Sequence, residues 1–191
     1  MSIALRSVAG GCLLALLLGA TACDAGTVAS PPSAVASSPA PGSPGFFGGT
    51  DLAWVEITIA MNEELLPLLD LAPTHGSDDA VRALAAEVRS GHEQELVTLR
   101  QLHDQAKLPS QNPHKGMPMP GMVTPEQVAA AAAVKGAAFD KLLMRHLRTH
   151  VEQGVKLAES EAKAGVEPQT KALAAQVISS RDRLLARLSA S

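Results

Sequence analysis

Two groups of residues in this sequence carry side chains that bind soft metal ions. The first group is His146 and His150, which are four positions apart. In a helix this spacing places both imidazoles on the same face. Neutral imidazole is the commonest metal ligand among protein side chains. The pair could therefore share one metal ion.

The second group lies in segment 114–122, which reads HKGMPMPGM. It combines the imidazole of His114 with the thioethers of Met117, Met119 and Met122. Soft thioethers beside an imidazole, without any thiolate, suit copper. The prolines keep the chain extended, so Met117 and Met119 could both turn toward one ion. The alternative is a surface connector whose methionines cover the end of the folded domain.

The segments that position these side chains belong to an internal repeat. A shift of 89 residues aligns 51–99 with 140–188 without a gap, and about twelve of the roughly fifty aligned pairs are identical. The longest match is Ala-Leu-Ala-Ala at 83–86 and again at 172–175. The two halves are therefore predicted to be related by a pseudo-twofold axis.

The repeat adds Met61 to the first group. Met61 occupies the position equivalent to His150, so we expect the two side chains to lie close together across the pseudo-twofold axis. A thioether beside imidazoles favours reduced copper. The alternative is that His150 is partly buried and hydrogen-bonded by Glu63 or Glu152, with Met61 as core packing.

Apolar residues recur at intervals of three and four in both repeats, which is the period of an amphipathic helix. Gly76 ends the first helix, and Pro67 is expected to kink or shorten it. Thr124-Pro125-Glu126-Gln127 resembles a capping box and starts a short Ala-rich helix that Gly136 interrupts. No segment alternates like a strand. We therefore predict an all-α four-helix bundle made of two repeated helical hairpins, joined by a loop near 109–123.

The chain resembles a known family, the domain of unknown function 305, over residues 51 to about 188. The resemblance rests on Asp51-x-x-Trp54, on Phe139-Asp140, on the Met-Pro-Gly-Met-type loop and on the doubled Ala-Leu-Ala-Ala segment. It implies a ferritin-like helical bundle of the kind found in exported bacterial proteins, some of which are associated with copper outside the cytoplasm.

Members of that family carry a His-His pair followed by Glu in the first helix of each half. This chain instead reads Met61-Asn62-Glu63 and His150-Val151-Glu152, and His92 stands where the family usually has Gln. The family's metal chemistry therefore does not carry over intact. The family-motif positions in this chain are Asp51, Trp54, Asn62, Glu63, Glu95, Phe139, Asp140 and Glu152.

The N-terminal residues indicate export. Residues 1–22 combine one basic residue, a short apolar run and small residues before Cys23, as in a signal peptide. Ala20-Thr21-Ala22-Cys23 resembles a bacterial lipobox, whose cysteine becomes the lipidated N-terminus; the alternative is an ordinary secretory signal. Residues 23–49 are rich in Ala, Ser, Pro and Gly and predict a disordered tether. Residues 50–191 are then the bundle domain.

Composition excludes several classes of function. Cys12 and Cys23 are the two cysteines, and neither remains as a thiol in a mature lipoprotein, so disulfides and thiolate chemistry are excluded. The net charge of −3 and the scattered basic residues argue against nucleic-acid binding. No recognisable catalytic constellation is present.

We therefore expect a lipid-anchored protein on the outer face of the cell membrane. It would bind a soft metal, most plausibly copper, without acting as an enzyme. The alternative is a metal-free structural or protein-interaction lipoprotein that has lost the family's ligands.

Overall fold

The computed structural model describes residues 42–190, which belong to one compact unit of the chain. Every regular element in this range is a helix. The helices are α1 (Gly49–Asp70), α2 (Ala72–His75), α3 (Asp79–Gln105), α4 (Pro125–Ala132), α5 (Ala137–Ala164) and α6 (Pro168–Ala190). The prediction of an all-α fold is confirmed. The predicted signal peptide, the lipobox and most of the tether lie outside the described residues.

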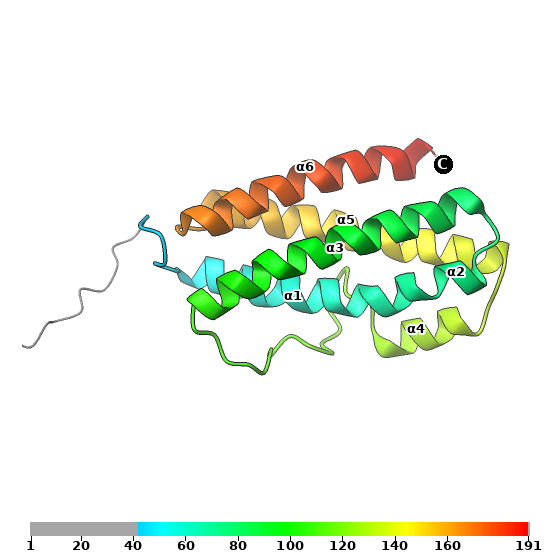
Figure 1. The fold of residues 1–191 in the computed structure, drawn as a ribbon, viewed down its shortest axis with the longest axis horizontal. Coiled ribbons are helices and arrows are strands. Elements are labelled where there is room, and N and C mark those ends of the chain that lie inside the picture. The colour runs from blue at the N-terminus through cyan, green and yellow to red at the C-terminus, as the bar shows by residue number, and fades with distance from the viewer. Residues whose placement is uncertain (1–41, 191) are drawn as a thin grey trace, which may run out of the picture. The chain divides into compact units, whose positions relative to one another are not determined.

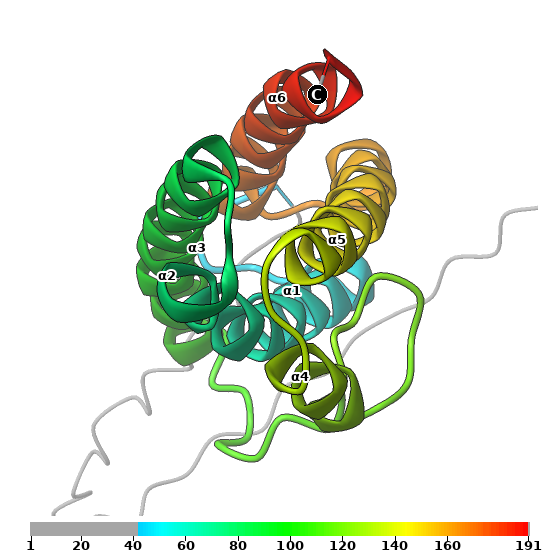
Figure 2. The same cartoon turned by 90° about the vertical axis from the view of Figure 1, so that its right-hand side faces the viewer.

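The four long helices form a bundle of two antiparallel hairpins (Figures 1 and 2). α1 packs against α3, α5 packs against α6, and α1 joins the two hairpins by packing against α5. Segment 106–124 passes alongside α1 and leads into α4, which covers α1 and α5 from outside (Figure 1). α3 and α6 make no comparably close packing. No helix within 42–190 is long and apolar enough to cross a bilayer.

The helix ends follow the local sequence. Pro67 is exposed in the last part of α1, which ends three residues later at Asp70. The short α2 follows and ends at His75, directly before Gly76. Thr124 and Gln127 form the predicted capping box at the start of α4. Gly136 has φ of +67° and precedes α5, so a residue without a Cβ lets the chain turn between the two helices. The Ala-rich helix is interrupted, but α4 already ends at Ala132, and Gly136 instead marks the start of α5.

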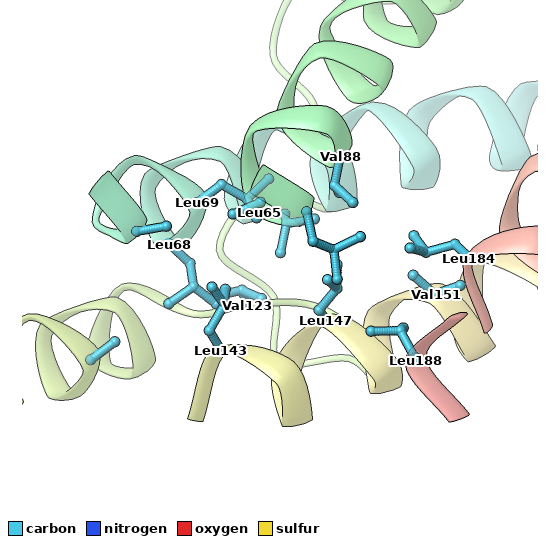
Figure 3. Close-up of a cluster of buried hydrophobic side chains, with 14 of the residues drawn as sticks. Leu65, Leu68, Leu69, Val88, Val123, Leu143, Leu147, Val151, Leu184 and Leu188 are labelled. Atoms are coloured by element: carbon cyan, nitrogen blue, oxygen red, sulfur yellow. The ribbon is translucent and has the colours of Figure 1, made fainter. Parts of the chain in front are cut away.

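The core contains two large apolar clusters with a polar layer between them. One cluster, shown in Figure 3, draws on α1, α3, α5 and α6 and includes Leu65, Leu147 and Leu184. The other lies nearer the start of α1 and includes Trp54, Leu99 and Val177, with Phe47 packed against it. Phe47 is thus a packing residue next to the first helix.

The residues between the two clusters are not apolar. Asn62, His92 and His150 are each about 1% exposed, and Arg181 is 5% exposed. Together with Glu95, to which two of them are hydrogen-bonded, these residues are here called the polar layer. A buried polar layer of this kind must satisfy its hydrogen bonds internally.

Candidate metal centre

The two histidines of the polar layer face each other. Nε2 of His92, on α3, lies 2.9 Å from Nε2 of His150, on α5, and the ring centroids are 5.0 Å apart. Each ring is also fixed from behind by a backbone carbonyl. His92 Nδ1 lies 2.8 Å from the carbonyl oxygen of Val88, and His150 Nδ1 lies 3.1 Å from that of Gly121.

These contacts determine where the protons of the rings must be. A carbonyl oxygen only accepts hydrogen bonds, so the Nδ1 atom of each ring must carry the proton and donate it. A neutral imidazole has one N–H, so both Nε2 atoms are then bare. The two lone pairs meet at 2.9 Å. The Arg181 guanidinium also donates to His92 Nε2 at 3.2 Å, so the lone pair of His150 Nε2 is the one that lacks an electrophile, either a proton or a metal ion.

Burial works against a proton in this position. Burial lowers the pKa of both imidazoles, and the neighbouring Arg181 guanidinium lowers it further. The pKa of His150 falls to about 3, and that of His92 falls well below its ordinary value of 6.5. Both rings are therefore neutral at neutral pH. Each ring donates its Nδ1–H to a backbone carbonyl and has an unprotonated Nε2, which is the usual arrangement of a metal-binding histidine.

Arg181 brings a fixed positive charge to the layer. Its guanidinium donates two hydrogen bonds to the Glu95 carboxylate, at 2.8 and 2.7 Å. The same Nη2 atom that contacts Glu95 lies 3.2 Å from Nε2 of His92. Asn62 donates to Glu95 at 3.1 Å. The layer is thus a connected network of one cation, one anion and two neutral imidazoles.

Three thioethers lie next to this layer. Met61 and Met122 are buried together in a small cluster, against which Met119 packs. Gly121, whose carbonyl faces His150, belongs to the same loop as Met119 and Met122. A Cβ on Gly121 would lie 3.1 Å from the terminal methyl of Met61, so Met61 and the loop are in close contact. Met61 and His150 of the first predicted group and Met119 and Met122 of the second therefore lie in one neighbourhood.

Other parts of the sequence prediction are corrected. Met117 is 45% exposed, whereas Met119 is packed against Met61 and Met122, so Met117 and Met119 are not turned toward a common point. His114 is partly buried in the loop, and its Nδ1 has no hydrogen-bond partner among the described residues. Neither Met117 nor His114 is placed with the thioether cluster.

The expected partners of His150 are also different. Glu152 is exposed and Glu63 pairs with Arg100 at 2.8 Å, so neither satisfies His150. His146 is half-buried one turn before His150, and no hydrogen bond or ring contact in the described range joins the two histidines. Within residues 42–190, no three His, Cys, Asp or Glu side chains converge as a metal-binding group. The histidine partner is His92, from the other repeat.

A surface cavity leads to the polar layer. It lies between α3 and α6, has a volume of about 290 Å³, and is lined by His92, Glu95 and Arg181 among other residues. A second cavity of about 420 Å³ continues along the same two helices and shares Gly91 and Glu95 with the first. The buried pair is therefore approached from the side where α3 and α6 pack least closely.

Comparison with known proteins identifies the family. The model of the domain of unknown function (DUF305) matches residues 51–190. The chain belongs to the DUF305 family. No curated protein sequence matches the chain. The remaining family-motif positions are structural here, since Trp54 and Phe139 are core residues and Asp51 and Asp140 lie near helix ends.

Solved DUF305 structures share the fold. A "secreted protein DUF305" of Streptomyces coelicolor is 19% identical, with a TM-score of 0.65 over 73% of this chain and 89% of that chain. A DUF305 fragment from Deinococcus radiodurans is 14% identical, with a TM-score of 0.68 over 78% of this chain and 97% of that one. CopM in the Cu(I)-bound form is 17% identical, with a TM-score of 0.62 over 74% of this chain and 94% of that one.

The repeat contained a signal for the histidine pair. The shift of 89 residues places Met61 on His150 and His92 on Arg181. These four positions therefore face one another around the pseudo-twofold axis, and they are filled by one methionine, two histidines and one arginine. Considering all four positions together, and not only the His-His motif, would have paired His92 with His150.

Proposed function

We propose that this protein binds Cu(I) between the Nε2 atoms of His92 and His150. It acts as an extracytoplasmic protein, anchored to the membrane through a lipid on Cys23, and it holds the ion without turning over a substrate. One observation carries the proposal. Two bare imidazole nitrogens face each other at 2.9 Å while their Nδ1–H groups are committed to backbone carbonyls.

The donor set fits a soft monovalent ion. Metal–imidazole bonds of about 2.0–2.1 Å at a tetrahedral angle separate two nitrogens by about 3.3 Å. The pair at 2.9 Å therefore needs to open by a few tenths of an ångström. Imidazole and thioether ligands suit Cu(I), and the Met61, Met119 and Met122 cluster lies beside the pair. A bound copper ion would take up both Nε2 lone pairs, and on His92 it would displace the hydrogen bond from Arg181.

Two of the structural relatives support this reading. One is by its name a copper protein, CopM in the Cu(I)-bound form. Another is named as a secreted protein, which agrees with the export signal expected from residues 1–22. At identities under 20% these relatives share the fold with this chain. The assignment of copper to this chain therefore rests on its own histidine pair.

Arg181 favours a second candidate function. A guanidinium paired with Glu95 is a permanent cation inside the layer, and it repels any metal ion next to His92. On this reading the protein is a metal-free structural or interaction lipoprotein. The Arg181–Glu95 pair would then have taken over the charge that a metal supplies. The polar layer would serve to fix the alignment of the helices.

A competition titration with a Cu(I) chelator distinguishes the two candidates. The full-length protein should bind Cu(I), and His92→Gln and His150→Gln should each weaken binding by at least about tenfold, because each removes one of two ligands. His146→Gln is the matched control, since His146 is half-buried one turn away on the same helix, and it should bind like wild type. Absence of Cu(I) binding in the wild type would overturn the copper proposal and favour the metal-free function.

A further inference from the structure

The Arg181 guanidinium occupies a position that would otherwise suit a metal ion. Its Nη2 atom is 2.7 Å from an oxygen of Glu95 and 3.2 Å from Nε2 of His92. One nitrogen atom is thus in contact with a carboxylate and an imidazole, which are two common ligand types for divalent metals. The Arg181 side chain is 6% exposed and that of Glu95 is 14% exposed, so this charge pair is shielded from water.

The charges of the layer then sum to zero. Arg181 contributes one positive charge and Glu95 contributes one negative charge, and a histidine that binds a metal ion does so as a neutral imidazole. A monovalent ion at the histidine pair leaves the layer with one excess positive charge, whereas a divalent ion leaves it with two. The cost of burying charge rises steeply with its magnitude. The layer therefore tolerates a monovalent ion much better than a divalent one.

The internal repeat shows that Arg181 is a deviation from symmetry. Its equivalent in the first repeat is His92, and the equivalent of Glu95 in the second repeat is Leu184. One half of the layer thus carries the imidazole and the carboxylate. The other half carries the guanidinium, beside an apolar leucine of the core. The Arg181 guanidinium therefore comes from the second repeat, which contributes no carboxylate to the polar layer.

We propose that Arg181 is the specificity-determining residue of this centre. Its guanidinium occupies the place beside Glu95 and His92 that a divalent ion would take, and it restricts the centre to a monovalent ion. This inference rests on the proposed function, because it concerns the selectivity of the same site. The α3–α6 cavity, which both Arg181 and Glu95 line, is the side from which an ion reaches them.

The test is a pair of titrations on the full-length protein in detergent, with Cu(I) and with Zn(II). Arg181→Met keeps the apolar stem of the side chain and removes its charge, leaving Glu95 uncompensated. Zn(II) affinity should rise by at least about tenfold over wild type, as expected for removing a like charge within a few ångströms. Arg145→Met is the matched control, since Arg145 is exposed on α5 and does not line the α3–α6 cavity, and it should leave both affinities unchanged.

A double variant separates charge from folding. Arg181→Met/Glu95→Gln removes both charges of the pair. It should bind Cu(I) more tightly than wild type, because the cation 3.2 Å from His92 is gone, and it should gain less Zn(II) affinity than Arg181→Met, because the carboxylate is gone as well. If Arg181→Met does not fold by circular dichroism, the Cu(I) affinity of the double variant decides. Unchanged Zn(II) affinity in folded Arg181→Met, or unchanged Cu(I) affinity in the double variant, overturns the role of Arg181. Lack of Cu(I) binding in the wild type overturns the proposed function instead, and the Zn(II) comparison remains decisive for Arg181.

Discussion

Asp51 and Asp140 each cap a helix of the opposite repeat. Asp51, on α1, accepts a hydrogen bond from the backbone N–H of Glu167 at 3.0 Å, just before α6. Asp140, on α5, accepts from the N–H of Asp78 at 3.1 Å and from the hydroxyl of Ser77 at 2.6 Å, just before α3. The two aspartates are 89 positions apart and thus equivalent in the repeat. These reciprocal caps join the two hairpins at opposite ends of the bundle.

Removing either cap should destabilise the bundle to a similar degree. Asp51→Ala and Asp140→Ala each leave backbone N–H groups at a helix start without an acceptor, and each should cost about 1–3 kcal/mol of unfolding free energy. Urea denaturation followed by circular dichroism measures this. Asp79→Ala is the control, because its pairing with Arg82 is on the surface and is expected to contribute less than about 1 kcal/mol. Equal stability of all three variants would show that the caps do not hold the repeats together.

The carboxyl group of Asp51 also lies next to that of Glu161, a residue that has no counterpart in the first repeat. Glu161 is fully buried, and neither of its oxygens accepts a hydrogen bond from an N–H or O–H group in the described range. Burial and the adjacent Asp51, which accepts a hydrogen bond from the protonated form, together raise the pKa of Glu161 to about 8. The folded protein therefore holds a proton that the unfolded chain, with an ordinary pKa of 4.5, releases.

The sign of the pH dependence follows from this difference. Below the unfolded pKa both states are protonated, and the stabilising contribution of the proton is fully present. It is lost as pH rises toward about 8, with a slope of up to about 1.4 kcal/mol per pH unit. Glu161→Gln cannot titrate, so the stability difference between wild type and this variant should change steadily from pH 5 to pH 8. Glu159→Gln, exposed on the same helix, should follow wild type, and parallel curves for all three would contradict the buried proton.

Gly121 and Gly116 offer a matched test of the loop that reaches His150. Both have φ in the left-handed region, +79° and +76°. A Cβ on Gly121 would lie 2.5 Å from the Cβ of Gln153, whereas one on Gly116 would meet nothing within 4 Å. Gly116→Ala should therefore cost only the backbone strain of about 1–2 kcal/mol, and Gly121→Ala distinctly more. Equal melting temperatures for the two variants would show that the loop is not packed against α5 as described.

The helices were predictable because their periodicity and end signals are local. The capping box at Thr124, the stop before Gly136 and the repeat of two hairpins needed no knowledge of tertiary contacts. The polar layer was not predictable in the same way. Periodicity shows which face of a helix is buried, but not which residue of another helix it meets. The hydrogen bond between Arg181 and Glu95 joins residues 86 positions apart.

His146 illustrates the limit of the helical spacing argument. Four residues turn an α-helix by about 400°, so His146 and His150 differ by about 40° in direction and by about 6 Å along the axis. This difference is enough to leave His146 half-buried while His150 lies in the layer. The loop methionines show a similar limit. Prolines restrict the backbone around Met119, but tertiary packing decides that Met119 is packed with Met61 and that Met117 is exposed.

The membrane anchor is tested at Cys23. Residues 20–23 read Ala-Thr-Ala-Cys, and lipidation of the cysteine with two or three acyl chains would give firm membrane attachment. Cys23→Ala should therefore move the protein from the detergent phase to the aqueous phase in phase partitioning, or leave it unprocessed. Cys12→Ala is the control, because Cys12 lies inside the expected signal peptide. Equal partitioning of wild type and Cys23→Ala would favour an ordinary secretory signal.

The thioether cluster is tested by replacing methionines with leucine. Leu keeps the size and apolarity of Met, so Met119→Leu/Met122→Leu should change unfolding free energy by less than about 1.5 kcal/mol. If the thioethers contribute to copper binding, Cu(I) affinity should fall, while Cu(II) binding through the two imidazoles persists. Met117→Leu is the matched control, because Met117 is exposed in the same loop, and it should change neither quantity. If the double variant and this control bind Cu(I) equally well, the buried methionines are packing material and the histidine pair alone carries the site.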